Sequence, residues 1–398
     1  MSTVDRSALM HTYADPPVTF VRGRGSELWD VEGRRYLDFL GGLAVTSLGH
    51  AHPEVADAVA EQAHTLVHVS NLFGNVVAPE VALTLDRLIG GGQPAGGQVF
   101  FANSGAEANE CAIKLARRWA GPGRHVVVSA LDSFHGRTLA TLHATGQTAK
   151  HAPFAPLPEG FEHVPYDDLG ALDAALDPTR VAAVLLEPMQ GEAGVIEPSS
   201  DYLGGVQQLC RQRGVLLMVD EVQTGLGRTG RWFGFQHGLV QPDVVTMAKA
   251  LGNGMPIGAC WARAEVAAAF GPGDHATTFG GQPLAAAAAR ATLAVLQAED
   301  APERARRAGE RLRKGLSTLP GVAGVRGKGL LLAAALQRPV AAAAVGAALA
   351  RGLVVNAPRP DTIRLAPSLL VSDEHVDEAL ALLGEALRAV GADGGALR

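Results

Sequence analysis

The sequence predicts an α/β fold: a large domain built on a mostly parallel sheet, followed by a smaller α+β domain. Two observations carry this prediction. Six short apolar runs alternate with helical or loop stretches between residues 98 and 262, and runs this apolar are typical of strands buried on both faces of a parallel sheet. After residue 299 the chain changes to amphipathic helices rich in Arg, Ala and Leu, mixed with short strands.

Length and composition narrow the class of protein. The chain has 398 residues, of which 47% are hydrophobic and 19% are charged. This length predicts two or three domains, and this composition suits a large buried core. A net charge of −6 argues against nucleic acid or an anionic membrane as the main partner. Three widely spaced cysteines exclude a disulfide framework and a CxxC metal site. Neither a secretory leader nor a membrane span is recognisable, so we expect a cytoplasmic protein.

The elements of the large domain are predicted in order along the chain. Residues 28–40 predict a hairpin around Glu32–Gly33, and a helical pattern begins near Glu54. The last two of the apolar runs lie close together, so one of them is open to an antiparallel arrangement. The strands predicted for the large sheet are 98–102, 125–130, 181–186, 215–219, 243–247 and 257–262.

Loops and the second domain complete the predicted order. The Pro-rich stretch 151–166 and the stretch 270–283 are expected to be loops, and Pro283 fits the first turn of a helix over 284–298. Short strands are expected at 329–335 and 362–366. The predicted organisation is an N-terminal segment that packs with the small domain (1–55), a large cofactor-binding domain (56–289) and a small C-terminal domain (290–398).

Polar and charged residues follow five of the predicted strands. In an open α/β sheet, ligands bind beyond the carboxyl ends of the strands, where such residues meet. The segments in these positions are Asn103–Glu107, Asp132–Arg137, Glu187–Glu192, Asp220–Gln223 and Lys249. An anion cradle, an aromatic ring, carboxylates and a lysine are thus expected at one edge of the sheet, which indicates a ligand site there. No metal site is predicted.

The segment Ser104–Glu107 predicts the start of a helix that could bind phosphate. Ser104 and Glu107 have the spacing of a capping box, and Gly105 lets a ligand approach the backbone. Free amides and the helix dipole favour an anion at such a point. A plain helix start is the alternative interpretation, because capping boxes are common.

Lys249 and Asp220 each leave a buried strand. Desolvation of Lys249 would lower the pKa of its amine and let it form a Schiff base; a lysine whose amine reaches solvent is the alternative. A buried Asp220 needs a positive partner, and the pyridine nitrogen of pyridoxal phosphate is one candidate. A helix N-cap and a magnesium ligand are alternatives for Asp220, although no GxxxxGK[ST] motif supports nucleotide binding.

These residues stand within longer stretches that together identify a family. In chain order the stretches are YLDFLGGLAVTSLGHAHPEV, HVSNLFGN, FFANSGAEANECAIKLAR, SFHGRT, LLEPMQGEAGV, DEVQTGLGRTG, PDVVTMAKALGNGMPIGA, TTFGGQPLA and IRLAPSLLV. Over nearly its whole length, the chain resembles the class III, fold-type I pyridoxal-phosphate aminotransferases. The resemblance implies the fold-type I architecture and pyridoxal 5′-phosphate as the cofactor.

The resemblance also implies the cofactor contacts. Lys249 would form the Schiff base and move a proton, and Asp220 would pair with the pyridine nitrogen. Phe134 would stack on the ring and Gln223 would bind the ring hydroxyl, while Thr278 would reach the phosphate of the other subunit in a homodimer. The implied cofactor-binding set is Ser104, Gly105, Ala106, Phe134, Asp220, Glu221, Val222, Gln223, Lys249 and Thr278, with Lys249 and Asp220 catalytic.

Small-molecule substrates follow from the same resemblance. Arg137, together with Thr277, would bind the carboxylate far from the transferred amine, and Arg364 would bind the α-carboxylate of glutamate. Glu192 would neutralise Arg364 when an ω-amine reacts, because an unpaired buried guanidinium is unfavourable. The implied reaction transfers the amine of N-acetylornithine to 2-oxoglutarate, in arginine biosynthesis, and N-succinyl-diaminopimelate is a candidate second substrate.

Other interpretations stay open on the sequence alone. Succinylornithine, free ornithine or 4-aminobutyrate would use the same cofactor. A racemase or a decarboxylase could use Lys249 and Asp220, although the pairing of Arg364 with Glu192 favours an enzyme that alternates between two substrates. A binding protein that kept the fold without catalysis is the most distant alternative.

Overall fold

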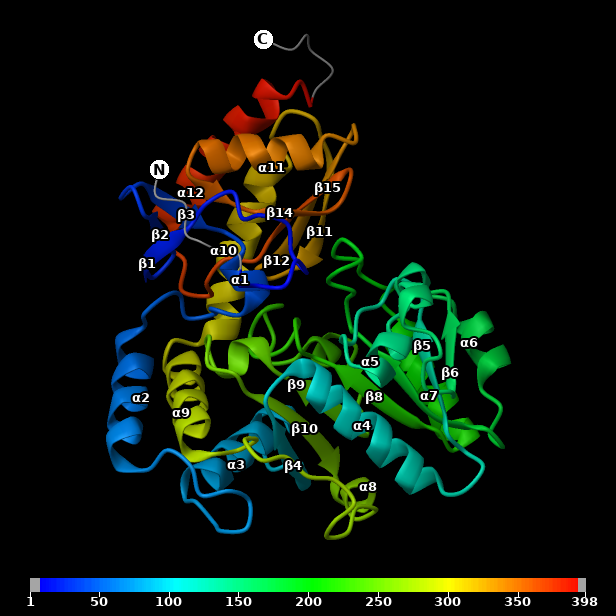
Figure 1. Ribbon diagram of the computed structural model, residues 1–398. Coiled ribbons are helices and arrows are strands. Elements are labelled where there is room, and N and C mark those ends of the chain that lie inside the picture. Colours follow the sequence, from blue (N-terminus) through cyan, green and yellow to red (C-terminus); the bar gives the residue numbers. More distant parts are fainter. Residues whose placement is uncertain (1–7, 393–398) are drawn as a thin grey trace.

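The apolar runs in the middle of the chain form one seven-stranded sheet in the computed structural model, which describes residues 8–392 (Figure 1). The strand order is β4–β10–β9–β8–β7–β5–β6. Strand β10 runs antiparallel to both of its neighbours, and the other neighbouring pairs are parallel. The bounds are β4 Gly97–Ala102, β5 Val126–Ala130, β6 Phe161–Val164, β7 Val181–Leu186, β8 Leu216–Asp220, β9 Val244–Met247 and β10 Gly258–Arg263.

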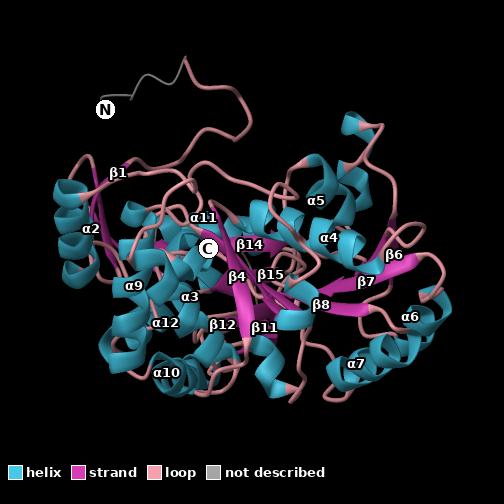
Figure 2. Cartoon of the chain, turned by 90° about the horizontal axis from the view of Figure 1, so that it is seen from below, coloured by secondary structure: helices cyan, strands magenta, loops and turns pink. Residues whose placement is uncertain are grey.

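Helices cover both faces of this sheet, as Figure 2 shows for α4 and α5 on one face and α6 and α7 on the other. Along β7, Val184 packs in the same core cluster as Val206 of α7, whereas Leu185 packs in a second cluster with Ile113 of α4. The strand therefore has no polar face, as its apolar run predicts. The α-helices between residues 41 and 298 are α1 Gly41–Ala44, α2 Pro53–Thr65, α3 Val77–Ile89, α4 Gly105–Ala120, α5 Leu139–Ala144, α6 Leu169–Ala175, α7 Tyr202–Arg213, α8 Ala264–Ala267 and α9 Pro283–Ala298.

The C-terminal region is built on a four-stranded antiparallel sheet of order β11–β12–β15–β14. A second four-stranded sheet, β1–β2–β3–β13, ties the N-terminal segment to this region, because β3 pairs in parallel with β13. Arg35 of β3 also donates to Glu378 of α12 at 2.7 and 3.1 Å. The bounds are β1 Phe20–Arg24, β2 Glu27–Asp30, β3 Arg35–Asp38, α10 Ala301–Leu316, β11 Val322–Lys328, β12 Leu331–Leu336, α11 Ala341–Ala350, β13 Leu353–Val354, β14 Asn356–Arg359, β15 Thr362–Leu365 and α12 Asp373–Ala389.

The predicted hairpin, the six strands and the helix beginning at Pro283 are confirmed, and the antiparallel strand is β10. The expected burial on both faces is wrong for β4, which lies at the edge of the sheet and buries only Ala102. The prediction of a loop throughout 151–166 is wrong, because β6 lies within it as an edge strand beside β5. Two of its four residues are only half-buried, so it lacks the apolar run that marks a central strand. The limits at residues 55 and 290 stay predictions; α9 continues across residue 290.

None of the helices within residues 8–392 combines the length and the apolar character needed to cross a bilayer.

Arg228 links parts of the chain that are far apart in sequence. Its guanidinium is fully buried, donating from Nη1 to the carbonyls of Leu330 and Pro367 and from Nη2 to Ser47 Oγ at 3.1 Å. Burial lowers the pKa of Arg228 to about 9. The side chain thus supplies buried donors to acceptors in the N-terminal segment and in the C-terminal region.

Replacing Arg228 tests this link. Arg228→Ala should lower the free energy of unfolding by roughly 3 kcal/mol, because buried acceptors lose their donor and a cavity remains. Urea denaturation followed by circular dichroism measures the change. Arg231→Ala, at an exposed arginine three residues later, is the matched control and should change it by less than about 0.5 kcal/mol. Equal effects of the two variants would show that Arg228 does not hold the regions together.

Candidate active site

The carboxyl ends of β5, β7, β8 and β9 bring the predicted residues to one edge of the large sheet. Asp220 is the last residue of β8, and Lys249 follows β9 by two residues, at the start of the short 3₁₀ helix η4 (Lys249–Leu251). Because β8 and β9 are paired neighbours, the carboxylate and the amine come from adjacent strands. Phe134 and Glu187 follow β5 and β7 at the same edge.

The Asp220 carboxylate is held by buried polar side chains. Its Oδ2 accepts a hydrogen bond from Asn109 Nδ2 at 2.8 Å and lies 2.9 Å from His135 Nδ1. The amide oxygen of Asn109 in turn accepts from Thr246 Oγ1 at 2.7 Å. Among the described residues, Asp220 Oδ1 accepts only from the backbone amide of Val222, at 3.0 Å. The network therefore fixes the orientation of the carboxylate and leaves Oδ1 able to accept a further donor.

Lys249 presents a half-buried amine beside this network. Burial lowers the pKa of the amine, while the negative charges of Glu192 and Asp220 act in the opposite direction. A lowered pKa increases the fraction of neutral amine, which is the nucleophilic form. The backbone of Lys249 has a φ of 42°, and left-handed non-glycine residues of this kind cluster at functional sites.

Helix α4 begins at the same edge. Ser104 is its N-cap and accepts a hydrogen bond from the Glu107 amide at 3.2 Å, while Glu107 binds the amide of Asn103 at 2.6 Å rather than that of the N-cap. Helix geometry leaves the amides of Gly105 and Ala106 without intrahelical acceptors. A Cβ added to Gly105 would lie 2.9 Å from the methyl groups of Val222, so only glycine fits this close approach. The helix start thus offers backbone donors to an anion.

Arg364 of β15 pairs with Glu192, which follows β7. Arg364 Nη1 lies 2.5 Å from Glu192 Oε1 and also donates to Gln223 Oε1 and to the Gly191 carbonyl, both at 3.2 Å. Burial alone would raise the pKa of Glu192, but the charge and hydrogen bond of Arg364, together with the Lys249 charge and the Gln223 hydrogen bond, keep that pKa below its ordinary value. Arg364 Nη2 is buried without a hydrogen-bond partner within residues 8–392. A buried, unpaired guanidinium nitrogen is suited to receive a carboxylate.

The residues after Asp220 diverge from the predicted set. Glu221 binds elsewhere: its carboxylate accepts from Thr224 Oγ1, and from the amides of Gly234 and Phe235 at 2.9 and 2.8 Å. Burial raises the pKa of Glu221 to about 7. Its carboxylate stabilises a neighbouring loop, and the cofactor contact of Glu221 stays a prediction. Gln223 contacts both members of the ion pair: its Oε1 accepts from Arg364 Nη1 at 3.2 Å, and its Nε2 donates to Glu192 Oε1 at 3.3 Å.

The outer predicted residues lie around this core. The exposed Arg137 guanidinium stands 5.5 Å from the ring centre of Phe134. Thr277 Oγ1 accepts from Asn103 Nδ2 at 3.3 Å, which places the 277–282 loop beside the start of α4. Thr278 is exposed on this loop. Within residues 8–392, no group of three or more His, Cys, Asp and Glu side chains is placed to hold a metal ion.

Three buried residues of the site had no assigned role in the prediction: Asn109 lay outside the predicted segments, while His135 and Glu187 lay within them. Asn109 and His135 hold Asp220, and Glu187 accepts from the amides of Phe134 and Gly191 at 3.1 and 3.2 Å. Burial raises the pKa of Glu187 to about 7. The available signal was position: Asn109 lies about one turn after Gly105 on α4, and His135 directly follows Phe134. Their partners are distant in sequence, so the contacts themselves cannot be inferred from it.

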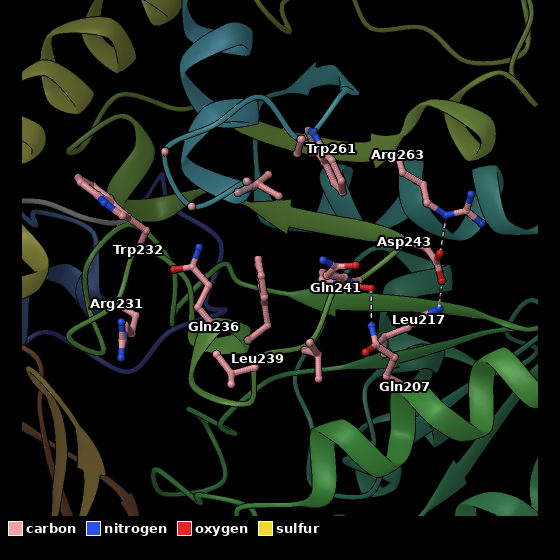
Figure 3. Close-up of a pocket in the computed structure, with 18 of the residues that line it drawn as sticks. Gln207, Leu217, Arg231, Trp232, Gln236, Leu239, Gln241, Asp243, Trp261 and Arg263 are labelled. Atoms are coloured by element: carbon pink, nitrogen blue, oxygen red, sulfur yellow. Dashed lines mark hydrogen bonds and ion pairs between the residues drawn. The ribbon is translucent and has the colours of Figure 1, made fainter.

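A groove of about 1270 Å³ lies at the opposite edge of the sheet (Figure 3). Its lining contains none of the predicted site residues. The polar side chains in it largely satisfy one another, since Arg263 Nε lies 2.6 Å from Asp243 Oδ1 and Gln207 donates to the Gln241 carbonyl at 2.7 Å. The size of a cavity therefore does not identify the active site. The buried charged groups around Lys249 identify it instead.

Comparison with known proteins agrees with this geometry. The family described as Aminotransferase class-III matches residues 9–387. An acetylornithine aminotransferase from Corynebacterium efficiens is 50% identical and aligns over 95% of this chain and 94% of its own length. One from Mycobacterium tuberculosis is 48% identical, over 97% of this chain and 96% of its own.

Solved structures show the same likeness. The ornithine aminotransferase from Toxoplasma gondii has a TM-score of 0.91 and 37% identity, covering 97% of this chain and 94% of its own. The N-acetylornithine aminotransferase from Stenotrophomonas maltophilia has a TM-score of 0.83 and 37% identity, covering 96% of this chain and 98% of its own. The chain therefore belongs to the class III aminotransferases.

Proposed function

We propose that the protein transfers the ω-amino group of N-acetylornithine to 2-oxoglutarate with pyridoxal phosphate as cofactor, giving N-acetylglutamate semialdehyde and glutamate. The observation that carries the proposal is the Glu192–Arg364 ion pair close to the Lys249 amine, whose pKa is lowered by burial. An arginine that can be either neutralised or opened to a carboxylate suits an enzyme that alternates between two substrates. The similarity to acetylornithine aminotransferases supports this substrate pair.

The residues at the sheet edge fit pyridoxal phosphate. When bound, this group supplies an electron sink for the charge left as a proton departs from the amine-bearing carbon. Lys249 offers a nucleophilic amine to the aldehyde, and Asp220 Oδ1 offers an acceptor to the ring nitrogen. The amides of Gly105 and Ala106 offer donors to the phosphate, and Phe134 offers a ring face beside them.

Lys249 also serves as the base in this proposal. Its Nζ takes the proton from the amine-bearing carbon of the substrate and passes it on to the cofactor. The lowered pKa favours the neutral amine that this step requires. Asn109 and His135 keep the Asp220 carboxylate oriented throughout, so that no reorganisation is needed as charge develops.

The two substrates use the same two arginines differently. Arg137 binds the carboxylate far from the reacting amine, with Thr277 close by. With N-acetylornithine, no carboxylate lies near Arg364, and Glu192 neutralises its charge. With glutamate, the Glu192 side chain withdraws, and Arg364 binds the α-carboxylate through Nη1 and the otherwise unpaired Nη2.

A homodimer with shared sites completes the proposal, with Thr278 reaching the phosphate held by the other subunit. Large apolar side chains are exposed near Thr278, namely Leu72, Phe73, Val76 and Phe279. Asn71 Nδ2 donates to the carbonyls of Thr277 and Gly280 at 2.9 and 3.2 Å, so these side chains belong to two joined segments. An exposed apolar patch of this kind is typical of an interface. We place the enzyme in the cytoplasm, in keeping with three free, buried cysteines.

The substrate assignment is tested on the purified holoenzyme by absorbance of the bound cofactor. Adding N-acetylornithine without an oxo-acid should bleach the absorbance, and 2-oxoglutarate should restore it. Free ornithine should react slower by orders of magnitude, up to roughly 10⁴-fold, because the site binds the acetyl amide and leaves an α-ammonium without a partner. 4-Aminobutyrate, which lacks the acetylamino group altogether, should also react far more slowly. Lys249→Ala should abolish both phases because no other residue takes its place as nucleophile.

Each other result of this experiment has a definite meaning. Bleaching by succinylornithine or N-succinyl-diaminopimelate, but not by N-acetylornithine, would keep the reaction and replace the acyl group. Bleaching by free ornithine or 4-aminobutyrate alone would replace the substrate class. A protein that takes up no pyridoxal phosphate would overturn the cofactor assignment.

Glu192→Ala tests the alternation between the substrates. The N-acetylornithine half-reaction should slow by roughly ten- to a hundredfold, because Arg364 is left buried and unneutralised. The glutamate half-reaction should change far less, since the substrate carboxylate supplies the missing charge. Stopped-flow measurement of each half-reaction separates the two effects, and Glu192→Gln should resemble Glu192→Ala. Equal losses in both half-reactions would contradict this role.

A further inference from the structure

The backbone that carries Glu192 is fastened by two arginines of the C-terminal sheet. Arg359 of β14 donates through Nε to the carbonyl of Ala193. Arg326 of β11 donates through Nη2 to the carbonyl of Gly194 at 3.0 Å. Ala193 and Gly194 are the two residues that follow Glu192. The C-terminal region therefore holds the loop next to the residue that bears the carboxylate.

Arg359 also reaches a second loop of the site. Its Nη2 lies 3.0 Å from Asp132 Oδ2. Asp132 stands two residues before Phe134, in the loop that also carries Arg137. The Arg359 side chain therefore contacts two loops of the site. One loop carries Phe134 and Arg137, and the other carries Glu192.

The same hairpin carries the partner of Glu192. Strands β14 and β15 are paired, and Asn356 of β14 accepts from Arg364 Nε at 3.2 Å. Arg364 and Arg359 thus project from one two-stranded unit, one to the carboxylate of Glu192 and the other to the next backbone carbonyl. The distance between Glu192 and Arg364 is then set twice, once by the ion pair and once through Arg359.

The loop itself has little room to move. Gln190 and Ile196 exchange backbone hydrogen bonds at 3.0 and 2.9 Å, closing the loop at its base. Gly194 has a φ of 103°, and a Cβ added there would lie 3.3 Å from Arg359 Cδ. Withdrawal of Glu192 from Arg364 must therefore occur mainly by rotation of its side chain, with the backbone held in place.

We propose that Arg359 is a positioning residue for substrate choice: by holding the Ala193 carbonyl and Asp132 together, it keeps Glu192 in register with Arg364. The inference rests on the proposed aminotransfer between an ω-amine and 2-oxoglutarate. Without Arg359, the Glu192 backbone gains freedom and the ion pair weakens. The ω-amine substrate, which needs Arg364 neutralised, then loses more than glutamate, which supplies its own carboxylate.

The experiment measures two half-reactions and one binding constant in the holoenzyme. Arg359→Ala should slow the N-acetylornithine half-reaction about tenfold and the glutamate half-reaction less than about threefold. Glutarate, a dicarboxylate without an amine, should bind with unchanged or up to about threefold lower Kd by calorimetry, because it no longer competes with a well-placed Glu192. Arg359→Lys, which keeps the charge beside Asp132, should recover part of the loss.

A double-mutant cycle with Glu192→Ala shows whether Arg359 acts through Glu192. Adding Arg359→Ala to Glu192→Ala should change the ratio of the two half-reactions by less than about twofold, since coupled residues are not additive. Arg304→Ala is the matched control, because Arg304 also forms an ion pair and its side chain is 42% exposed, as is that of Arg359. This control should leave both half-reactions unchanged.

The outcomes separate this inference from the proposed function. If the wild-type holoenzyme does not react with N-acetylornithine, the substrate assignment fails, and the glutarate constant still tests Arg359. Equal slowing of both half-reactions, weaker glutarate binding, or a full Arg359→Ala effect in the Glu192→Ala background would each overturn the positioning role. A thermal unfolding midpoint close to that of the wild type shows that the variant is folded. If Arg359→Ala does not fold, Asp132→Asn replaces it. This variant removes only the ion pair and should change the ratio of the two half-reactions in the same direction by a smaller factor.

Discussion

A guanidinium buried where two parts of the chain meet constrains the rest of this site. The Arg364 side chain is 1% exposed, and a counter-charge lowers the free-energy cost of burying such a charge. Glu192 provides it from a loop of the large sheet, while Asn356 orients the Nε end and Gln223 shares the Nη1 end. The loop geometry, the hairpin and the sheet behind it keep this one carboxylate and this one arginine within reach of each other.

Two buried arginines show how the same side chain can be fixed or exchangeable. Arg228 donates to carbonyl and hydroxyl oxygens that belong to the framework, and these acceptors have nowhere to go when a ligand arrives. Arg364 donates to a carboxylate on a rotatable side chain. Within residues 8–392 each arginine keeps one buried nitrogen without a hydrogen-bond partner, Nε in Arg228 and the terminal Nη2 in Arg364. The first arrangement suits a permanent link between regions, and the second suits a contact that a substrate can take over.

The sequence predicts the core of the fold and of the site for a physical reason. Strands buried on both faces must be continuous apolar runs, so β7 and β8 are visible in the sequence, and the residues that follow them must lie at one edge. Edge strands β6, β11 and β14 are only partly buried and carry no such mark. His135, Asn109 and Arg359 act through partners 85 to 166 residues away, and no local pattern encodes those contacts. Glu221 shows the converse, because a residue adjacent to Asp220 points its carboxylate to another loop.

The reversed direction of β10 limits how this family member can be tuned. Because this strand enters the sheet at the edge where its neighbours leave it, its first residue, Gly258, borders the start of α4, and a Cβ there would lie 2.3 Å from the Ser104 carbonyl oxygen. Val222 closes Gly105 from another side. Neither Gly258 nor Gly105 therefore has room for a larger side chain beside the start of α4. Of the two residues that offer backbone amides to the phosphate, Gly105 is thus fixed, and Ala106, a small residue in this protein, is left to adjust the phosphate affinity.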